Sequence, residues 1–223
     1  MEISKRLKKI ASLADESVIA DIGCDHALVC IEAIEQGKVQ KAYACDLREG
    51  PLKQAKINIA RHGLSDRITT RLESGIHNLP EDTKQILICG MGGKLIEQIL
   101  SEDPIGPNVQ SMLLSAHKDT PDLRRWLIEN GWLIENEWMV EDGHFYPILK
   151  VIRNTDPNQI PVLLQDQGSL NFGFYPIVNE DYKNYLDWQI NLWQTIITNM
   201  PEPAKSRQQD LIDLAKKRQA SLS

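Results

Sequence analysis

With 223 residues and a formal net charge of −6, the chain is long enough for one α/β domain with an appendage, and it is not basic throughout. A composition of 42% hydrophobic and 25% charged residues argues against a disordered chain and fits a protein with a buried core. The sequence holds no run of 18 apolar residues, so we expect no contact with a membrane and a cytoplasmic location.

Short β-rich runs alternate with helical stretches in the first two thirds of the chain, after an amphipathic helix at the N-terminus. The strands are expected over residues 17–23, 41–47, 67–73, 84–90, 109–115, 132–140 and 145–152. Helices are expected over 31–36, 52–62 and 123–130, each ending at a glycine, with Thr120 as the cap of the last one and Pro121 at its first position. This alternation predicts parallel crossovers and a doubly wound α/β sheet with helices on both faces.

The last two strands have no helical pattern between them, only the turn signal of Asp142 and Gly143. We therefore expect an antiparallel hairpin, so that a mainly parallel seven-stranded sheet ends in an antiparallel edge strand. After Arg153 a segment rich in Pro, Gly and Asn predicts a linker that wraps back over the first domain.

A helical hairpin is expected at the C-terminus, and it would give a coiled-coil pair. Its first helix carries apolar residues in alternating steps of four and three: Leu186, Ile190, Trp193, Ile197 and Met200. The second helix carries Leu211 and Leu214. We expect two units, residues 1–153 and 154–223, in a monomeric protein.

The stretch DIGCDHALVC, residues 21–30, lies where a nucleotide-binding fold has its first strand-to-helix turn. Gly23 fits that turn, but position 25 is Asp where a dinucleotide site would have a glycine. Asp21 and Asp25 would repel a pyrophosphate, since one like-charge contact costs about 4 kcal/mol at an effective dielectric constant of 20. The same carboxylates would attract S-adenosylmethionine, which carries a sulfonium and an ammonium. Asp25 as a helix cap and His26 as a structural donor are the plainer alternatives.

Three further strand ends carry candidate residues. Asp46 ends the second strand, where an acid can accept both ribose hydroxyls of either kind of cofactor. Ser74 and Gly75 follow the third strand, where an adenine ring is usually contacted. The stretch GMGG, residues 90–93, permits close backbone approach to a flat base or to the methyl donor, although a tight packing turn is the alternative.

The four cysteines form no CxxC pair. We expect Cys24, Cys30, Cys45 and Cys89 to be reduced and mostly buried, with neither a disulfide framework nor a metal site.

The motifs DIGCDHA, CDLREGPL, GMGGKLI, LRRWLIENGW and EDGHFYPI, in this order, resemble the bacterial family of TrmK-like tRNA methyltransferases that modify ring nitrogen 1 of adenine 22. The resemblance implies a Rossmann-like class I methyltransferase fold, S-adenosylmethionine as the donor and tRNA as the partner. It assigns to the cofactor site Asp21, Gly23, Cys24, Asp25, His26, Asp46, Leu47, Ser74, Gly75, Gly90, Met91 and Gly92. Asp25 and Met91 would lie at the reacting atoms, and the substrate would contact Lys5, Arg6, Lys9, Gly92, Gly93 and His117.

The chain also departs from the family pattern, since Ser115, Ala116 and His117 stand where a polar trio is common and Ser74 replaces an Asn or Asp. Two alternatives therefore stay open. In the first, the same cofactor site serves the methylation of another RNA position or of a small molecule. In the second, the protein is a non-catalytic RNA-binding protein that has kept the fold.

Overall fold

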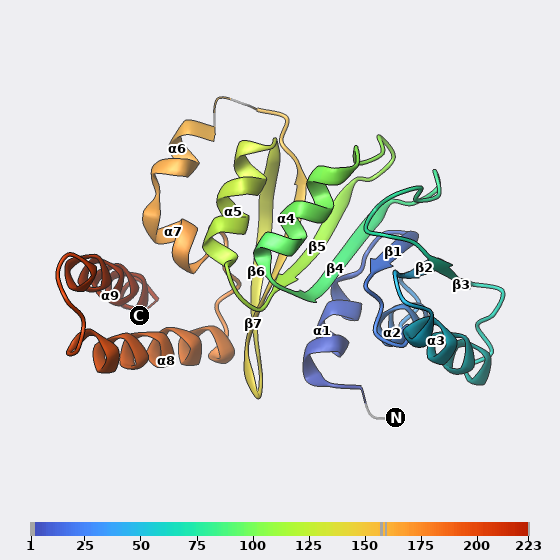
Figure 1. The fold of residues 1–223 in the computed structure, drawn as a ribbon, viewed down its shortest axis with the longest axis horizontal. Coiled ribbons are helices and arrows are strands. Elements are labelled where there is room, and N and C mark those ends of the chain that lie inside the picture. Colours follow the sequence, from blue (N-terminus) through green and yellow to red (C-terminus); the bar gives the residue numbers. More distant parts are fainter. Residues whose placement is uncertain (1–2, 157, 159, 223) are drawn as a thin grey trace.

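Seven strands rich in aliphatic residues form the central sheet of this computed structural model, which describes residues 3–156, 158 and 160–222 (Figure 1). The strands are β1 (Val18–Ile22), β2 (Lys41–Asp46), β3 (Ile68–Leu72), β4 (Gln85–Met91), β5 (Ser111–Ala116), β6 (Trp132–Asp142) and β7 (His144–Arg153). Their order is β3-β2-β1-β4-β5-β7-β6, and β1 to β5 are parallel. The doubly wound class I methyltransferase-type sheet predicted from the sequence is confirmed.

The β6–β7 hairpin lies at one end of this sheet, as predicted. Its antiparallel strand, β7, is inserted between β5 and β6 and pairs with both, so that β6 forms the edge. Helix α5 leads from β5 to β6, which is separated from β5 by one strand position. The tight turn at Gly143 then brings β7 into the position between them.

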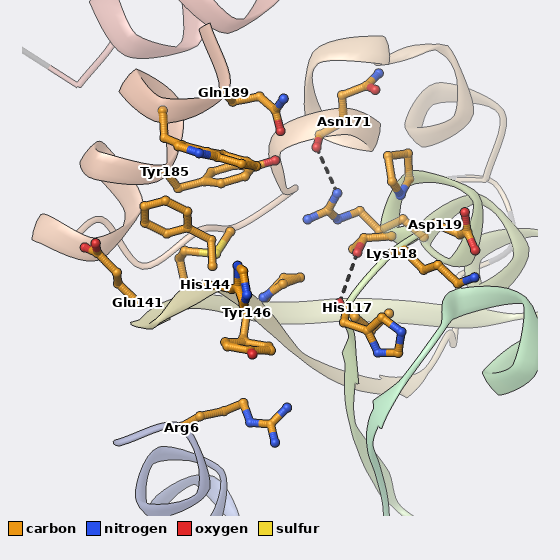
Figure 2. A pocket seen from close by; sticks show the side chains of 18 of the residues that line it. Arg6, His117, Lys118, Asp119, Glu141, His144, Tyr146, Asn171, Tyr185 and Gln189 are labelled. Carbon is orange, nitrogen blue, oxygen red and sulfur yellow. Dashed lines mark hydrogen bonds between the residues drawn. The ribbon is translucent and has the colours of Figure 1, made fainter. Parts of the chain in front are cut away.

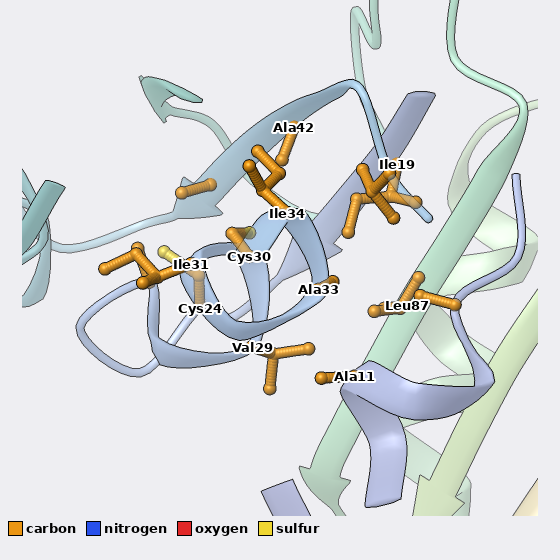
Figure 3. Packing of buried hydrophobic residues seen from close by; sticks show 14 of the residues in the cluster. Ala11, Ile19, Cys24, Val29, Cys30, Ile31, Ala33, Ile34, Ala42 and Leu87 are labelled. Atoms are coloured by element: carbon orange, nitrogen blue, oxygen red, sulfur yellow. The ribbon is translucent and has the colours of Figure 1, made fainter. Parts of the chain in front are cut away.

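Helices cover both faces of the sheet because its central strands bury side chains on both sides. They are α1 (Lys5–Leu13), α2 (Leu28–Glu35) and α3 (Glu49–Arg61) on one face, and α4 (Gly93–Glu102) and α5 (Thr120–Glu129) on the other. Figure 3 shows Val29 and Ala33 of α2 beside Ala11 of α1. The N-cap of α5 is Asp119, one residue before the predicted Thr120, whose hydroxyl instead donates to Ala116 O at 3.5 Å.

The C-terminal helices α8 (Glu180–Ile197) and α9 (Ala204–Ala220) pack side by side, and α8 also packs against β6 (Figure 1). Leu186 and Ile190 of the predicted seam are buried. On α9 the buried residues are Ile212 and Ala215 rather than Leu211 and Leu214, which are half-buried, so the packing face is shifted by one residue. No helix among the described residues is long and apolar enough to cross a bilayer.

The segment between the sheet and this pair wraps back as predicted. It contains two short helices that the sequence analysis missed, α6 (Ile160–Gln165) and α7 (Gln167–Phe172). Its next residues run along the sheet edge, where Glu137 N donates to Tyr175 O at 3.0 Å and Ile177 N donates to Glu137 O at 2.7 Å. The division of the chain at Arg153 stays a prediction.

A buried ion pair joins this segment to the body. The guanidinium of Arg124 on α5 donates to Glu137 Oε2 on β6 at 2.9 and 2.7 Å, and both side chains are only 4% exposed. Arg124 also donates to the carbonyls of Leu170 and Asn171 on α7, and Glu137 Oε1 accepts from Phe174 N at 2.8 Å. All three guanidinium nitrogens of Arg124 and both carboxylate oxygens of Glu137 take part in these hydrogen bonds, as the burial of charged groups requires.

We expect the Arg124→Met variant to lose about 3–5 kcal/mol of unfolding free energy, because it leaves the Glu137 carboxylate buried without its partner. Adding Glu137→Gln to that variant should restore part of the loss, since the isolated charge is then gone. Urea denaturation measures both effects. Lys53→Met, which breaks the exposed pair with Glu49, is the control and should cost under about 1 kcal/mol. Strictly additive losses at Arg124 and Glu137 would contradict this account.

Candidate active site

The candidate cofactor residues come together at the carboxyl ends of four parallel strands. Ile22 of β1 is in register with Cys45 of β2 and with Ile88 of β4. The loops that follow β1, β2, β3 and β4 therefore open at one edge of the sheet, which is where doubly wound sheets bind ligands. All the cofactor residues expected from the sequence lie in or next to these four loops.

The loop after β1 is shaped by Gly23, which has a φ of +73°. The amides of Gly23 and Cys24 both donate to Cys45 O, at 2.8 and 2.9 Å. A Cβ on Gly23 would lie 2.3 Å from Met91 Cε, so the Met91 side chain rests directly on this loop. Met91 thus connects the first loop with the glycine turn after β4.

Two adjacent residues of the same loop also have left-handed backbones, His26 and Ala27, each with a φ of 59°. Such conformations are unfavourable for residues with a side chain and persist only where neighbours hold them. Here the side-chain amide of Asn58 on α3 donates to His26 O at 3.1 Å. The packing of α3 therefore fixes the shape of the loop.

Three carboxylates lie close to this loop in different environments. Asp21 is buried, and burial is the main cause that raises the pKa of its carboxyl to about 7. The Cys30 thiol, which donates to Asp21 at 3.9 Å, opposes this rise in pKa, and the charges of Asp25 and Asp46 add to it. The Asp25 side chain is 78% exposed at the mouth of the loop.

Asp46 is buried at the end of β2 and is held by its own turn. Its Oδ1 accepts from Arg48 N at 2.8 Å, and Arg48 Nε lies 3.6 Å from the same oxygen. Leu47 next to it is 70% exposed. Ser74, on the loop after β3, is also exposed and lies on the rim of the same edge.

All four cysteines lie near Asp21, three of them buried and Cys89 half-buried. Burial raises the pKa of every one of these thiols, that of Cys45 to about 12. They are therefore protonated near neutral pH and are not nucleophiles. The described residues contain no group of three His, Cys, Asp or Glu side chains placed to hold a metal ion.

The glycine turn after β4 packs tightly on the loop before α5. A Cβ on Gly93 would lie 2.6 Å from Asp119 O, and Gly93 N donates to Lys118 O at 2.9 Å. His117 N donates to Met91 O at 3.0 Å. Gly93 is therefore required for close packing, the alternative interpretation of this glycine stretch. Gly90, with a φ of +83°, is instead exposed at the edge of the sheet.

The first loop fits a cationic donor better than a pyrophosphate. The amides of Gly23 and Cys24, which would otherwise face a phosphate, are both taken up by Cys45 O. The charges of Asp25 and Asp46 act on Asp21, so the loop has a negative electrostatic environment. A ligand with positive charge would relieve this repulsion, and a phosphorylated one would increase it.

A cavity of about 870 Å³ lies beside this edge rather than on it (Figure 2). It is bounded by the loop before α5, by the tip of the β6–β7 hairpin and by α8. Figure 2 shows Arg6 of α1, His117 and Tyr146 among the side chains that line it. The Arg6 guanidinium lies over the Tyr146 ring at 4.5 Å. The cavity is the candidate site for a substrate.

The structure separates the substrate residues expected from the sequence. Arg6 and His117 line the cavity, and Gly92 and Gly93 lie next to its Lys118. The other two basic residues expected at the substrate, Lys5 and Lys9, are not among the residues that line the cavity. Lys5 pairs with Asp181 of α8 at 2.7 Å, and Lys9 lies 5.5 Å from the ring of Trp138.

Sequence reasoning missed the aromatic side chains of the cavity. Phe145 and Tyr146 follow the hairpin turn, and Tyr185, Trp188 and Trp193 come from α8. The sequence signal was present in EDGHFYPI and in the aromatic spacing of α8, but nothing local indicates that these two segments face each other.

A family model described as "Methyltransferase domain" matches residues 3–149. Over 154 residues the chain is 31% identical to the tRNA (adenine(22)-N(1))-methyltransferase of Bacillus subtilis (strain 168), a match that covers 67% of this chain. The match covers 64% of that protein's length.

Solved structures are similar over almost the full chain. Streptococcus pneumoniae Sp1610 in complex with S-adenosyl-L-methionine, described as a candidate tRNA (m1A22) methyltransferase, has a TM-score of 0.84 and 29% identity and covers 98% of this chain and 100% of its own. The same protein in another structure has 30% identity and a TM-score of 0.86, with the same coverage. M. capricolum TrmK in complex with S-adenosyl-homocysteine has a TM-score of 0.82 and 26% identity, with 99% of each chain covered.

We expect Asp21→Asn to flatten the pH dependence of stability between about pH 4 and 7. The folded-state pKa of Asp21, about 7, lies above its usual value of 3.8, so the folded chain keeps a proton that the unfolded chain has lost. Its contribution to the unfolding free energy is therefore full below pH 3.8 and is lost as the pH rises to about 7. Urea denaturation of both proteins across this range gives the difference; parallel curves would contradict the assignment.

Proposed function

The chain belongs to the TrmK-like family of tRNA (adenine-22, N1)-methyltransferases, which has the class I S-adenosylmethionine-dependent fold, and we propose that it methylates ring nitrogen 1 of adenine 22 in tRNA. The relatives bound to S-adenosyl-L-methionine and to S-adenosyl-homocysteine support the cofactor. When bound, this cofactor supplies an electrophilic methyl group on a sulfonium centre.

One arrangement carries the proposal. An acidic loop for a cationic donor and a cavity with free cations lie on either side of one short glycine turn. Met91 of that turn rests on Gly23 of the acidic loop, and the backbone of the same residue accepts from His117 of the cavity. A methyl group bound against the first loop and a base bound at the cavity would thus be separated only by this turn.

The residues at the turn have a positioning task rather than a proton-transfer task. Ring nitrogen 1 of a neutral adenine already holds an in-plane lone pair, so the attack on a methyl group needs no general base. Exclusion of water and alignment of the reacting atoms can supply about 7 to 11 kcal/mol of the barrier. Gly90, where an added Cβ would meet only Arg6 Nη1 at 3.7 Å, leaves room for a base next to the Met91 side chain, which would pack on its face.

The carboxylates gain a second role as the reaction proceeds. The methylated base is a cation, so positive charge moves from the donor toward the base, and Asp25 at the mouth would stabilise it throughout. Ring nitrogen 1 is also an atom of the Watson–Crick edge, so the base must leave its pair before it reaches the turn. The cations of the cavity would hold the backbone of the RNA while this occurs.

The direct test is nucleoside mass spectrometry of tRNA incubated with the protein and S-adenosylmethionine. We expect 1-methyladenosine to appear, and a tRNA with guanosine in place of adenine at position 22 to stay unmodified. Methylation that persists in that tRNA would point to another position. The absence of methylated adenosine with every tRNA tried would overturn the proposal.

We further expect Asp25→Asn to weaken S-adenosylmethionine about two- to fivefold, the scale of an exposed ion pair, and S-adenosylhomocysteine less. The two ligands differ in the sulfonium charge, so the ratio of their dissociation constants isolates the interaction with that charge. Isothermal titration calorimetry measures both. Asp66→Asn, at an exposed position before β3, is the matched control. Equal losses for the two ligands would place Asp25 away from the sulfonium.

A further inference from the structure

The cavity beside the glycine turn has more room and more aromatic surface than one target base requires. Its volume of about 870 Å³ lies near the upper end of the range of about 300 to 1,000 Å³ that ligand sites show. Its far wall is built by α8 and by the tip of the β6–β7 hairpin, away from Met91. Figure 2 shows Tyr185 and Gln189 of α8 opposite His117 and Lys118 of the loop before α5.

The far wall is an aromatic cluster in which Trp188 is exposed and its neighbours Phe145 and Tyr185 are half-buried. Trp188 packs on Phe145 with ring centroids 5.4 Å apart and on Tyr185 at 6.5 Å. These contacts fix the indole, yet Trp188 is still 47% exposed. A rigid and half-exposed tryptophan is a stacking surface for an unpaired base, since every base has a π-face.

The near wall carries two cations that form no salt bridge within the described residues. Arg6 and Lys118 line the cavity and take part in none of the ion pairs formed within the described residues. Arg124, the other guanidinium of the lining, is bound to Glu137. Asp119 and Glu141 also line the cavity, and Glu141 accepts from Asn184 at 3.1 Å. Two free cations beside an aromatic wall suit a phosphate followed by a base.

The near wall lies directly beside the turn that would hold the target base. A Cβ on Gly92 would lie 2.8 Å from Lys118 Cε, and one on Gly90 would lie 3.7 Å from Arg6 Nη1. A chain leaving the turn would therefore pass Arg6 and Lys118 before it reaches Trp188.

We propose that this aromatic cleft binds a second, unpaired nucleotide next to the target adenine, with its phosphate at Arg6 and Lys118 and its base stacked on Trp188. The inference rests on the proposed RNA substrate. It makes Trp188 a positioning residue: it holds the neighbour of the target base and so draws the RNA strand across the glycine turn.

The test is the affinity of the full chain for a short, fluorescently labelled, single-stranded oligoribonucleotide, measured by anisotropy. We expect Trp188→Ala to raise the dissociation constant about five- to hundredfold, the range equivalent to the loss of one stacked base. Trp188→Phe should retain most of the affinity. Leu192→Ala, at a 40% exposed position of the same helix outside the cleft, should bind as the parent chain does.

Two controls separate the loss of base stacking from misfolding and from the loss of phosphate contacts. Unchanged binding of S-adenosylhomocysteine shows that each variant is folded, and an oligonucleotide of abasic residues tests for stacking, because the parent chain and Trp188→Ala should bind it equally. Equal RNA affinity of Trp188→Ala and Leu192→Ala would overturn the inference, as would a loss that persists with the abasic strand.

The inference and the proposed function fail separately. If the parent chain methylates no tRNA but binds single-stranded RNA through Trp188, the cleft stands and the proposed function does not. If Trp188→Ala methylates tRNA with unchanged kcat/KM, the cleft is wrong and the proposed function stands.

Discussion

The buried pair of Arg124 and Glu137 is the interaction on which the shape of the substrate side depends. It links α5, β6 and the carbonyls of α7 through charge-assisted hydrogen bonds in a dry environment, where an unpaired charge would be costly. The linker is thereby held against the sheet, and α8 begins from a fixed point. Lys5 on Asp181 adds a second connection, between α1 and α8. The far wall of the cavity is therefore part of the folded body, although it is built from the last third of the chain.

Charge divides the functional edge of the sheet in two. On one side of Met91 lie the carboxylates near the first loop, two of which are buried. On the other side lie Arg6 and Lys118, whose side chains take part in none of the salt bridges among the described residues. A cationic donor and a polyanionic acceptor would each meet the opposite charge, and neither would bind well on the wrong side. The short turn at residues 90–93 is thus a boundary between two electrostatic environments.

The parts of this protein that could be predicted from sequence are those whose signals are local. The strand and helix pattern, the turn at Gly23 and the hairpin at Gly143 each depend on neighbours in the chain, and the structure confirms them. The position of β7 between β5 and β6 could not be predicted, because both arrangements have the same local pattern. The pairing of Lys5 with Asp181 could not be predicted either, because the two residues come from helices that are far apart in the sequence.

The segment that runs along β6 also limits the association of the sheet edge with other protein chains. An open strand edge offers unpaired amides and carbonyls to any passing chain, which is a common route to aggregation. Glu137 in the middle of β6 already exchanges both backbone hydrogen bonds with Tyr175 and Ile177. At this point the longest strand of the protein is capped by its own chain, so the link that positions the helical pair also blocks edge-to-edge association there.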